Sequence, residues 1–135
     1  MNKAVIFDID GTLADKYGRC PYDWESVGDD LPKKPVIKAL NAYKKAGYKI
    51  IIFTGRDGSC KKQTLAWLKK HSINFHHFDI RKAKDNRCDS IVKREMYDKI
   101  KDKYSVEAVF DDRDRVVRTW RDLGLQCFQV DYGAF

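Results

Sequence analysis

The chain has 135 residues, the size of one domain with a single buried core. Hydrophobic residues make up 43% of it and charged residues 35%, which excludes a disordered chain, and no apolar run approaches the ~20 residues that cross a bilayer. We therefore expect a cytoplasmic protein with no membrane partner. Its 27 basic and 20 acidic residues give a net charge of +7, which favours a polyanionic partner such as nucleic acid without requiring one.

Strand and helix patterns alternate along the chain. Residues 4–7 are apolar throughout, which is typical of a strand covered on both faces. The segment 33–49 is expected to be helical, with Pro35 in the first turn and Gly47 just past the helix end. Further strands are predicted within 48–56, 74–79, 106–112 and 125–130, and further helices within 58–71, 91–104 (capped by Ser90) and 115–124.

Strands that alternate with helices of this length predict an α/β fold. We expect a doubly wound, Rossmann-like parallel sheet of about five strands with helices on both faces, forming a single domain over residues 1–135. Little sequence remains between the predicted core elements for a large cap domain, so the site is expected to be open. A short hairpin around "DKYGRCPYD" is expected to cover part of it.

Polar residues follow the predicted strands at the points where they end. Because parallel strands point the same way, their carboxyl ends share one edge of the sheet, where ligands bind in open α/β folds. These residues are expected to converge there, together with Lys93 from the first turn of the helix capped near Ser90. The residues at the strand ends are Asp8, Asp10, Thr54, Gly55, Arg56, Asp111, Asp112 and Arg113.

Clustered carboxylates beside cations suit phosphate transfer with magnesium. Asp8, with Asp111 or Asp112, supplies the hard oxygen ligands that Mg²⁺ prefers, and Asp10 is a further candidate ligand. Asp8 is also the candidate nucleophile for an aspartyl-phosphate intermediate. Asp10, two residues along, is placed to protonate the leaving oxygen and later to deprotonate water.

Four segments, in order, carry a family resemblance: "DIDGT", "IIIFTGR", Lys93 and "AVFDDR". They resemble the four motifs of the haloacid dehalogenase-like phosphatase superfamily. The segments "GRCPYD", "DSIVKREMY", "FDDRDRVVRTWRDLG" and "CFQVDYGAF" are similar to the phosphatase domain of phage-type polynucleotide kinase/3'-phosphatases. The resemblance extends over essentially the whole chain.

The resemblance implies a Mg²⁺-dependent phosphatase that removes 3'-phosphates from nucleic-acid ends or nucleotides, with a separate kinase or ligase as a partner. No G-x-x-x-x-G-K-[ST] motif occurs, so kinase activity is not implied. By matching motif, Asp8 is the nucleophile, Asp10 the acid/base, and Thr54 and Lys93 hold the phosphoryl group. The remaining implied site residues are Gly55, Arg56, Arg19, Arg81, Asp89 and Arg113 for substrate and activity, and Asp8, Asp10, Asp111 and Asp112 for the metal. Cys88 departs from the family pattern, which has an acidic residue there.

Two other functions stay open at this point. One is a phosphatase of free nucleoside monophosphates, which would hydrolyse mononucleotides at least as well as oligonucleotides. The other is a phospho-aspartate signalling switch, which also uses Asp, Thr and Lys at strand ends. Asp10 argues against the switch, because an acid/base beside the phosphoaspartate shortens its lifetime.

Overall fold

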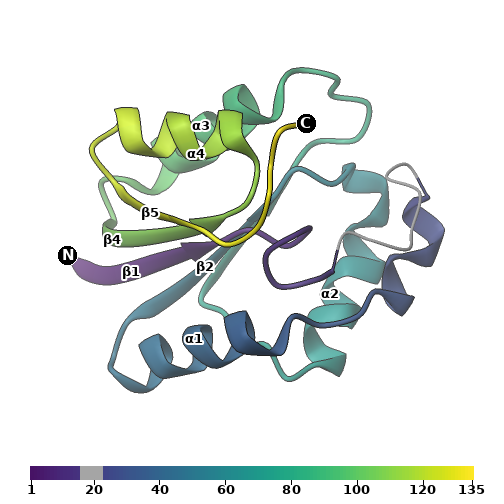
Figure 1. Cartoon of the computed structure of the whole chain (residues 1–135), viewed down its shortest axis with the longest axis horizontal. Helices are drawn as coiled ribbons and strands as arrows, with labels where there is room; N and C mark the ends of the chain where they lie inside the picture. The colour runs from purple at the N-terminus through teal and green to yellow at the C-terminus, as the bar shows by residue number, and fades with distance from the viewer. Residues whose placement is uncertain (16–22) are drawn as a thin grey trace.

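A computed structural model of the chain describes residues 1–15 and 23–135. Its centre is a five-stranded, all-parallel sheet with the strand order β3-β2-β1-β4-β5. The predicted doubly wound α/β fold is confirmed, and β1 lies in the middle of the sheet (Figure 1). The strands are β1 (Asn2–Phe7), β2 (Lys49–Thr54), β3 (His77–Ile80), β4 (Tyr104–Asp111) and β5 (Gln126–Gln129).

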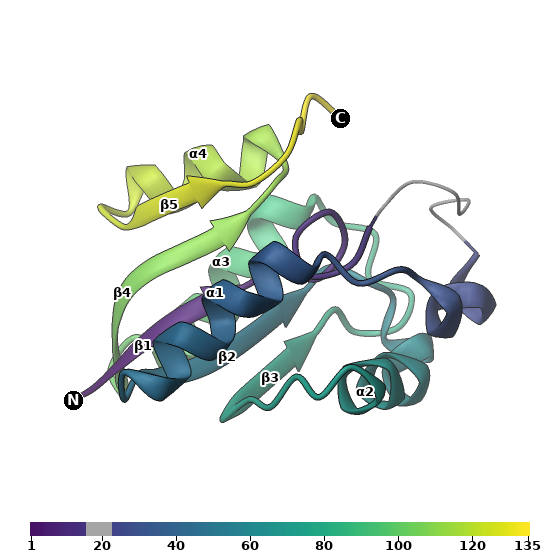
Figure 2. The ribbon, with the colours of Figure 1, turned by 60° about the horizontal axis from the view of Figure 1, so that its bottom comes forward.

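Helices cover both faces of the sheet, with α1 and α2 on one face and α3 and α4 on the other (Figure 2). Residues of β1 alternate between the two faces, so Val5 packs in the core under α1 and α2, while Ile6 packs in the core under α3 and α4. The helices are α1 (Lys34–Lys45), α2 (Lys61–Lys70), α3 (Asp89–Ile100) and α4 (Asp114–Asp122), with short 3₁₀ helices η1 (Trp24–Asp29) and η2 (Gly58–Cys60).

The helix α3 differs from its predicted bounds at both ends. It begins at Asp89, with Cys88 in the N-cap position, so Ser90 is not its cap and Lys93 lies in the second turn. It ends at Ile100, because Tyr104 already belongs to β4 and pairs with Asn2 of β1. The start of the predicted helix at 58–71 is likewise the 3₁₀ helix η2, and α2 begins at Lys61.

Hydrophobic packing accounts for the elements around the site. The residues of β1 from Ala4 onward are 0–1% exposed, as the apolar run predicted. Gly47 follows α1 with a φ of +96°, a left-handed conformation that ends the helix near the predicted position.

Among the described residues, no helix is long and apolar enough to cross a membrane. The predicted hairpin around "DKYGRCPYD" falls largely within residues 16–22, outside the described part of the chain.

Candidate active site

Three buried carboxylates meet at the carboxyl edge of the sheet. Asp8 follows β1, and Asp111 and Asp112 lie at the end of β4, the neighbouring strand. One oxygen from each carboxylate lies within 4.8 Å of the others. The close approach of the two loops requires Gly11, whose φ is +83° and where a side chain would collide with the Asp112 carboxylate. The three side chains could therefore share one divalent cation.

The ammonium group of Lys93 lies between two of these carboxylates. Its Nζ donates to Asp8 Oδ1 at 2.7 Å and to Asp111 Oδ2 at 3.0 Å, although Lys93 comes from α3 on one face of the sheet. The helix α3 therefore places the ammonium group of Lys93 at the carboxyl ends of β1 and β4. Thr12 and Trp120 complete the shell, donating to Asp8 Oδ2 and Asp111 Oδ2, each at 3.1 Å.

Burial and crowding raise the pKa of Asp8 well above its ordinary value. Removal from water is the largest cause, and the charge of Asp111 adds to it, while Lys93 acts in the opposite direction. Burial also works against the charge of Lys93, but the surrounding carboxylates prevail and raise the pKa of its ammonium group. Three carboxylates grouped so closely favour a dication, whose charge would add to that of Lys93.

Asp10 is held away from this cluster by Arg56. The Arg56 guanidinium donates to Asp10 Oδ1 at 2.8 Å and to Oδ2 at 3.0 Å, while the Asp10 side chain keeps 32% of its surface exposed. Among the described residues, the carboxylates close enough to share a metal are therefore those of Asp8, Asp111 and Asp112. The Asp10 side chain is not in this group, and Asp10 as a metal ligand stays a prediction.

Arg56 is buried beside Asp10, and its role toward the substrate stays a prediction. Its side chain has no exposed surface, and its guanidinium also donates to Asp30 Oδ2 at 3.0 Å and to Thr64 Oγ1 at 3.1 Å. Burial works against the charge of Arg56, but the hydrogen bond to Asp10 and the charges of Asp10 and Asp30 together prevail and raise the pKa of its guanidinium. Arg56 therefore holds the side chain of Asp10, the candidate acid/base, in one orientation.

A second charged group lies beside Gly55, after β2. Asp89 approaches so closely that a side chain at Gly55 would collide with its carboxylate. Asp89 contacts three cations, with Arg81 Nη2 at 3.1 Å and with Lys93 and Arg113 each at 3.8 Å. It therefore links the lysine of the carboxylate cluster to the predicted substrate arginines.

Arg81 is itself tied to backbone carbonyls. Its guanidinium donates to Gly55 O at 2.7 Å, to Asp85 O at 3.0 Å and to Arg87 O at 2.6 Å. These bonds hold the loop between β3 and α3 against the end of β2. A substrate contact by Arg81 stays a prediction, as does that of Arg19, which lies outside the described residues.

Thr54 and several residues that the sequence did not single out complete the site. Thr54 is 1% exposed, and its Oγ1 accepts the Arg56 N–H at 3.2 Å. Lys33 donates to Gly11 O at 3.0 Å and to Asp131 Oδ2 at 3.1 Å, joining segments at opposite ends of the chain. Trp120 packs in the core under α3 and α4, and its indole N–H also donates to Asp111 Oδ2. The 3.6-residue spacing of apolar residues in α4 does not indicate that Trp120 also donates a hydrogen bond.

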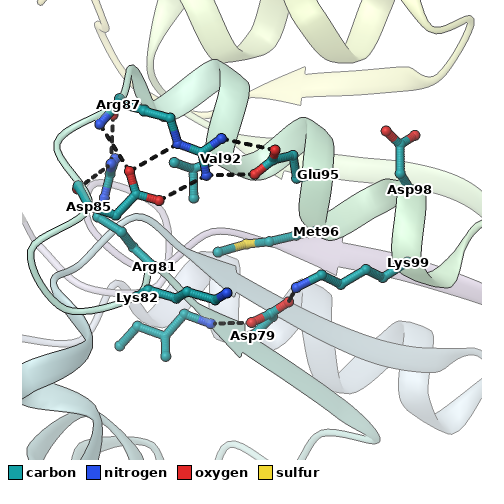
Figure 3. A pocket seen from close by; sticks show the side chains of 11 residues that line it. Asp79, Arg81, Lys82, Asp85, Arg87, Val92, Glu95, Met96, Asp98 and Lys99 are labelled. Atoms are coloured by element: carbon teal, nitrogen blue, oxygen red, sulfur yellow. Dashed lines mark hydrogen bonds and ion pairs between the residues drawn. The ribbon is translucent and has the colours of Figure 1, made fainter.

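A separate hollow of about 370 Å³ lies between β3 and α3 (Figure 3). Val92 and Met96 contribute apolar lining, and Arg87 closes one side through ion pairs to Asp85 and Glu95. Asp8, Asp111 and Asp112 do not line it. Its lining shares only Arg81 with the predicted site residues, so we place the active site at the buried aspartates and not at this hollow.

The parallel sheet, with buried aspartates and a lysine at its carboxyl edge, has the architecture expected of the haloacid dehalogenase-like superfamily. A class C acid phosphatase from Bacillus anthracis shares the fold, with a TM-score of 0.64 over 98% of this chain and 66% of its own, at 14% identity. The family is more specific. The model of the polynucleotide kinase PNKP phosphatase domain matches residues 2–135, so the chain belongs to this family and is a phosphatase.

Relatives with higher identity come from larger proteins. A baculovirus protein, from Autographa californica nuclear polyhedrosis virus and assigned as a bifunctional polynucleotide kinase/RNA ligase, is 35% identical over 90% of this chain and 18% of its own length. A chain in the structure of a Pnkp1/Rnl/Hen1 complex is 42% identical, with a TM-score of 0.96 over all of this chain and 48% of its own. The chain therefore spans less than half the length of either relative.

Proposed function

We propose that this domain is a Mg²⁺-dependent phosphatase that acts through a phosphoaspartate on Asp8 and removes 3'-phosphates from polynucleotide ends. The observation that carries the proposal is the position of Lys93 between Asp8 and Asp111, at 2.7 Å and 3.0 Å. A buried cation beside a buried carboxylate offsets the repulsion between that carboxylate and an incoming phosphate.

In the first step, an Asp8 oxygen attacks phosphorus and the bond from phosphorus to the 3'-oxygen breaks. Asp10, exposed on one side and oriented by Arg56, donates a proton to the leaving oxygen. Water then attacks the phosphoaspartate while Asp10 takes its proton, and inorganic phosphate leaves as the bond to Asp8 breaks. Lys93 and Thr54 would hold the phosphoryl oxygens.

The donor set fits magnesium. Asp8, Asp111 and Asp112 offer carboxylate oxygens within 4.8 Å of one another, which are the hard ligands that Mg²⁺ takes alongside water and phosphate. A bound Mg²⁺ would supply positive charge next to the phosphate oxygens. Burial and the charge of Asp111 raise the pKa of Asp8, and a bound Mg²⁺ would favour its ionised form.

The proposed substrate is an RNA end. Its support is the family of polynucleotide phosphatase domains, the RNA ligase activity in the name of the viral relative, and the net charge of +7. A polynucleotide kinase and an RNA ligase, on the same or a separate chain, are the proposed partners. Family membership removes the signalling switch, whereas a nucleoside monophosphate phosphatase remains the second candidate.

The test compares phosphate release from an RNA oligonucleotide with a 3'-phosphate, its 5'-phosphorylated counterpart and a nucleoside 3'-monophosphate. We expect the 3'-phosphorylated oligonucleotide to have the highest kcat/KM, an advantage that shrinks as salt rises because flanking phosphates release counterions. Excess EDTA should stop the reaction. Equal or better turnover of the mononucleotide at every salt concentration would favour the nucleoside monophosphate phosphatase. Full activity in excess EDTA would show that the reaction does not require a metal.

A quench experiment tests the covalent step separately. Acid quenching during turnover of a ³²P-labelled 3'-phosphate should leave label on the protein, released by hydroxylamine as expected of an acyl phosphate. The Asp8→Asn variant, run in parallel, should retain none. Wild-type protein without label under these conditions would contradict the phosphoaspartate.

A further inference from the structure

The helices α3 and α4 begin next to each other at the carboxyl edge of the sheet. Two contacts join their first turns: Arg115 Nη1 lies 3.9 Å from Cys88 Sγ, and Arg113 Nη1 lies 3.8 Å from Asp89 Oδ2. Both helices cover the same face of the sheet (Figure 2). Their N-terminal ends therefore form one continuous surface.

Asp89 connects this surface to the candidate reaction centre. Its Oδ2 lies 3.8 Å from Lys93 Nζ, and the same ammonium donates to Asp8 Oδ1 at 2.7 Å. Cys88 directly precedes Asp89 in the chain and contacts Arg115. A short series of contacts, through Cys88, Asp89 and Lys93, therefore joins the Arg115 guanidinium to the candidate nucleophile, and Arg115 lies beside the reaction centre but outside it.

The two arginines at the start of α4 occupy positions where a helix gains least from cations. Arg113 is the N-cap residue and makes no side-chain cap hydrogen bond, and Arg115 lies in the first turn. The N-terminus of a helix carries a partial positive charge, so acidic residues stabilise it and basic residues do not. Helix stability therefore does not explain these arginines, whereas an anion bound from outside the domain does.

Arg115 has no carboxylate partner within residues 1–15 and 23–135. Its side chain is exposed, and its guanidinium donates to Cys88 Sγ at 3.9 Å, which is a weak acceptor. Asp114, the adjacent acidic residue, accepts instead from Gln129 Nε2 at 2.6 Å. A thiol at position 88 therefore leaves the positive charge of Arg115 available to an anion from solvent.

We infer that Arg115 binds a second phosphate of the substrate, and that Cys88 permits this by leaving the guanidinium without a carboxylate. In a strand that ends in a 3'-phosphate, the nearest other phosphate is the one on the 5'-oxygen of the same nucleotide. The ligand class is therefore a nucleotide with phosphate on both its 3'- and 5'-oxygens. This inference rests on the proposed function and adds to it a residue that distinguishes such a nucleotide from a nucleoside 3'-monophosphate.

The test compares a ribonucleoside 3',5'-bisphosphate with the matching 3'-monophosphate, which differs from it by the 5'-phosphate alone. The measured quantity is the ratio of their kcat/KM values, which is internal to each variant and so insensitive to partial loss of folded protein. In the wild type the bisphosphate should be favoured roughly fivefold, as for one exposed ion pair, and less so as salt rises. Equal kcat/KM values in the wild type would overturn the inference.

A third substrate distinguishes a strand end from the free bisphosphate. In a 3'-phosphorylated dinucleotide, the 5'-oxygen of the last nucleotide carries a phosphodiester, and its advantage over the monophosphate should depend on Arg115 in the same way. Chromatography of the bisphosphate reaction should give the nucleoside 5'-monophosphate, which shows that the 3'-phosphate has left. Failure of the proposed function is distinguishable, because the wild type would then remove the 3'-phosphate from none of the three substrates.

Three substitutions on α4 isolate the contact. Arg115→Gln should bring the ratio close to one, mainly through a higher KM for the bisphosphate, whereas Arg115→Lys keeps the charge and should keep most of the ratio. Arg118→Gln, at an exposed position one turn further along α4, is the matched control and should leave the ratio unchanged. A ratio unchanged in Arg115→Gln, or lowered as much by Arg118→Gln, would overturn the inference.

Two substitutions at position 88 test the part of the thiol. Cys88→Asp brings a carboxylate to Arg115 and also introduces a favoured N-cap residue for α3, so the ratio should fall while Tm rises. Loss of folded protein cannot produce this pair of changes. Cys88→Ser can also cap the helix but brings no charge, and it should keep the ratio. A ratio unchanged in Cys88→Asp would overturn the role of Cys88.

Discussion

Two clusters in this domain place one cation between carboxylates, and they differ in burial. Lys93 lies between Asp8 and Asp111, with side chains 2–7% exposed, whereas Arg87 lies between Asp85 and Glu95, with Arg87 and Glu95 about half exposed. The distances are similar, 2.7 and 3.0 Å in the first cluster and 2.6 and 2.9 Å in the second.

Water makes the difference between them. Around Arg87, solvent screens the charges, so these ion pairs need no additional charge to balance them. The network therefore only orders the loop that it spans (Figure 3). Around Lys93, burial raises the pKa of Asp8, and a ligand atom of a further carboxylate, Asp112, lies within 4.8 Å of those of Asp8 and Asp111. The same types of side chain therefore form an exposed ion-pair network in one place. In the other they form a buried cluster, which we propose binds a cation and a phosphate.

The largest expected effect comes from removing the nucleophile. Asp8→Asn should lower kcat by roughly 10⁴-fold or more, because an amide cannot form the phosphoenzyme. It should also raise the metal-free Tm, since it removes one of the crowded buried charges. Phosphate release and thermal unfolding in EDTA measure both. Asp102→Asn, at an exposed position, is the matched control, and wild-type turnover by Asp8→Asn would refute the mechanism.

Asp10→Asn should lower kcat by about 10²- to 10⁴-fold, the range of one general acid/base. Because the Asp10 carboxylate is held by Arg56 and not by the metal group, the rise in Tm on adding Mg²⁺ should persist. Steady-state kinetics with a Mg²⁺ titration of Tm checks both parts. Loss of the Mg²⁺-dependent rise would instead make Asp10 a metal ligand.

Arg56→Lys should have an intermediate effect. The lysine keeps the charge but loses the forked donors that hold Asp10 and Asp30, which should cost about 1–3 kcal/mol of unfolding free energy and roughly tenfold in kcat. Urea unfolding and single-turnover rates measure the two effects. Arg118→Lys, at an exposed position, should change neither, and equal behaviour of the two variants would rule out the positioning role.

The smallest effect is expected in the exposed cluster. Hydrogen bonds from Arg87 lower the pKa of Asp85 from its ordinary 3.8 to about 2, so any stabilisation is present above pH 3.8 and is lost as the pH falls toward 2. In Arg87→Gln the Asp85 pKa should return toward 3.8, with Tm at neutral pH and turnover unchanged. Carboxyl chemical shifts report the pKa, and a large fall in Tm would show that solvent does not screen this network.

The sequence predicted the buried strands and the residues at their ends, because apolar runs and parallel connections leave few alternatives. It did not predict that Arg56 is buried, since an arginine after a strand end is equally compatible with exposure, and only Asp10, Asp30 and Thr64 together explain its position. The predicted start of α3 was wrong because the N-cap residue, Cys88, makes no side-chain hydrogen bond to the helix. The sequence therefore contains no capping residue that marks this boundary. Contacts made across long sequence distances, such as Lys33 with Asp131, leave no local pattern.

The central position of β1 has a consequence for how the domain is made. β1 pairs on one side with β2, as Ala4 does with Lys49, and on the other with β4, as Asn2 does with Tyr104. During synthesis, which adds about 5–20 residues per second, the first strand must wait for β4 before its second edge is covered. Closing so long a stretch of chain is also slow. The carboxylates of Asp8 and Asp111 therefore come together only after β4 has been made, and until then the second edge of β1 is open to association with other nascent chains.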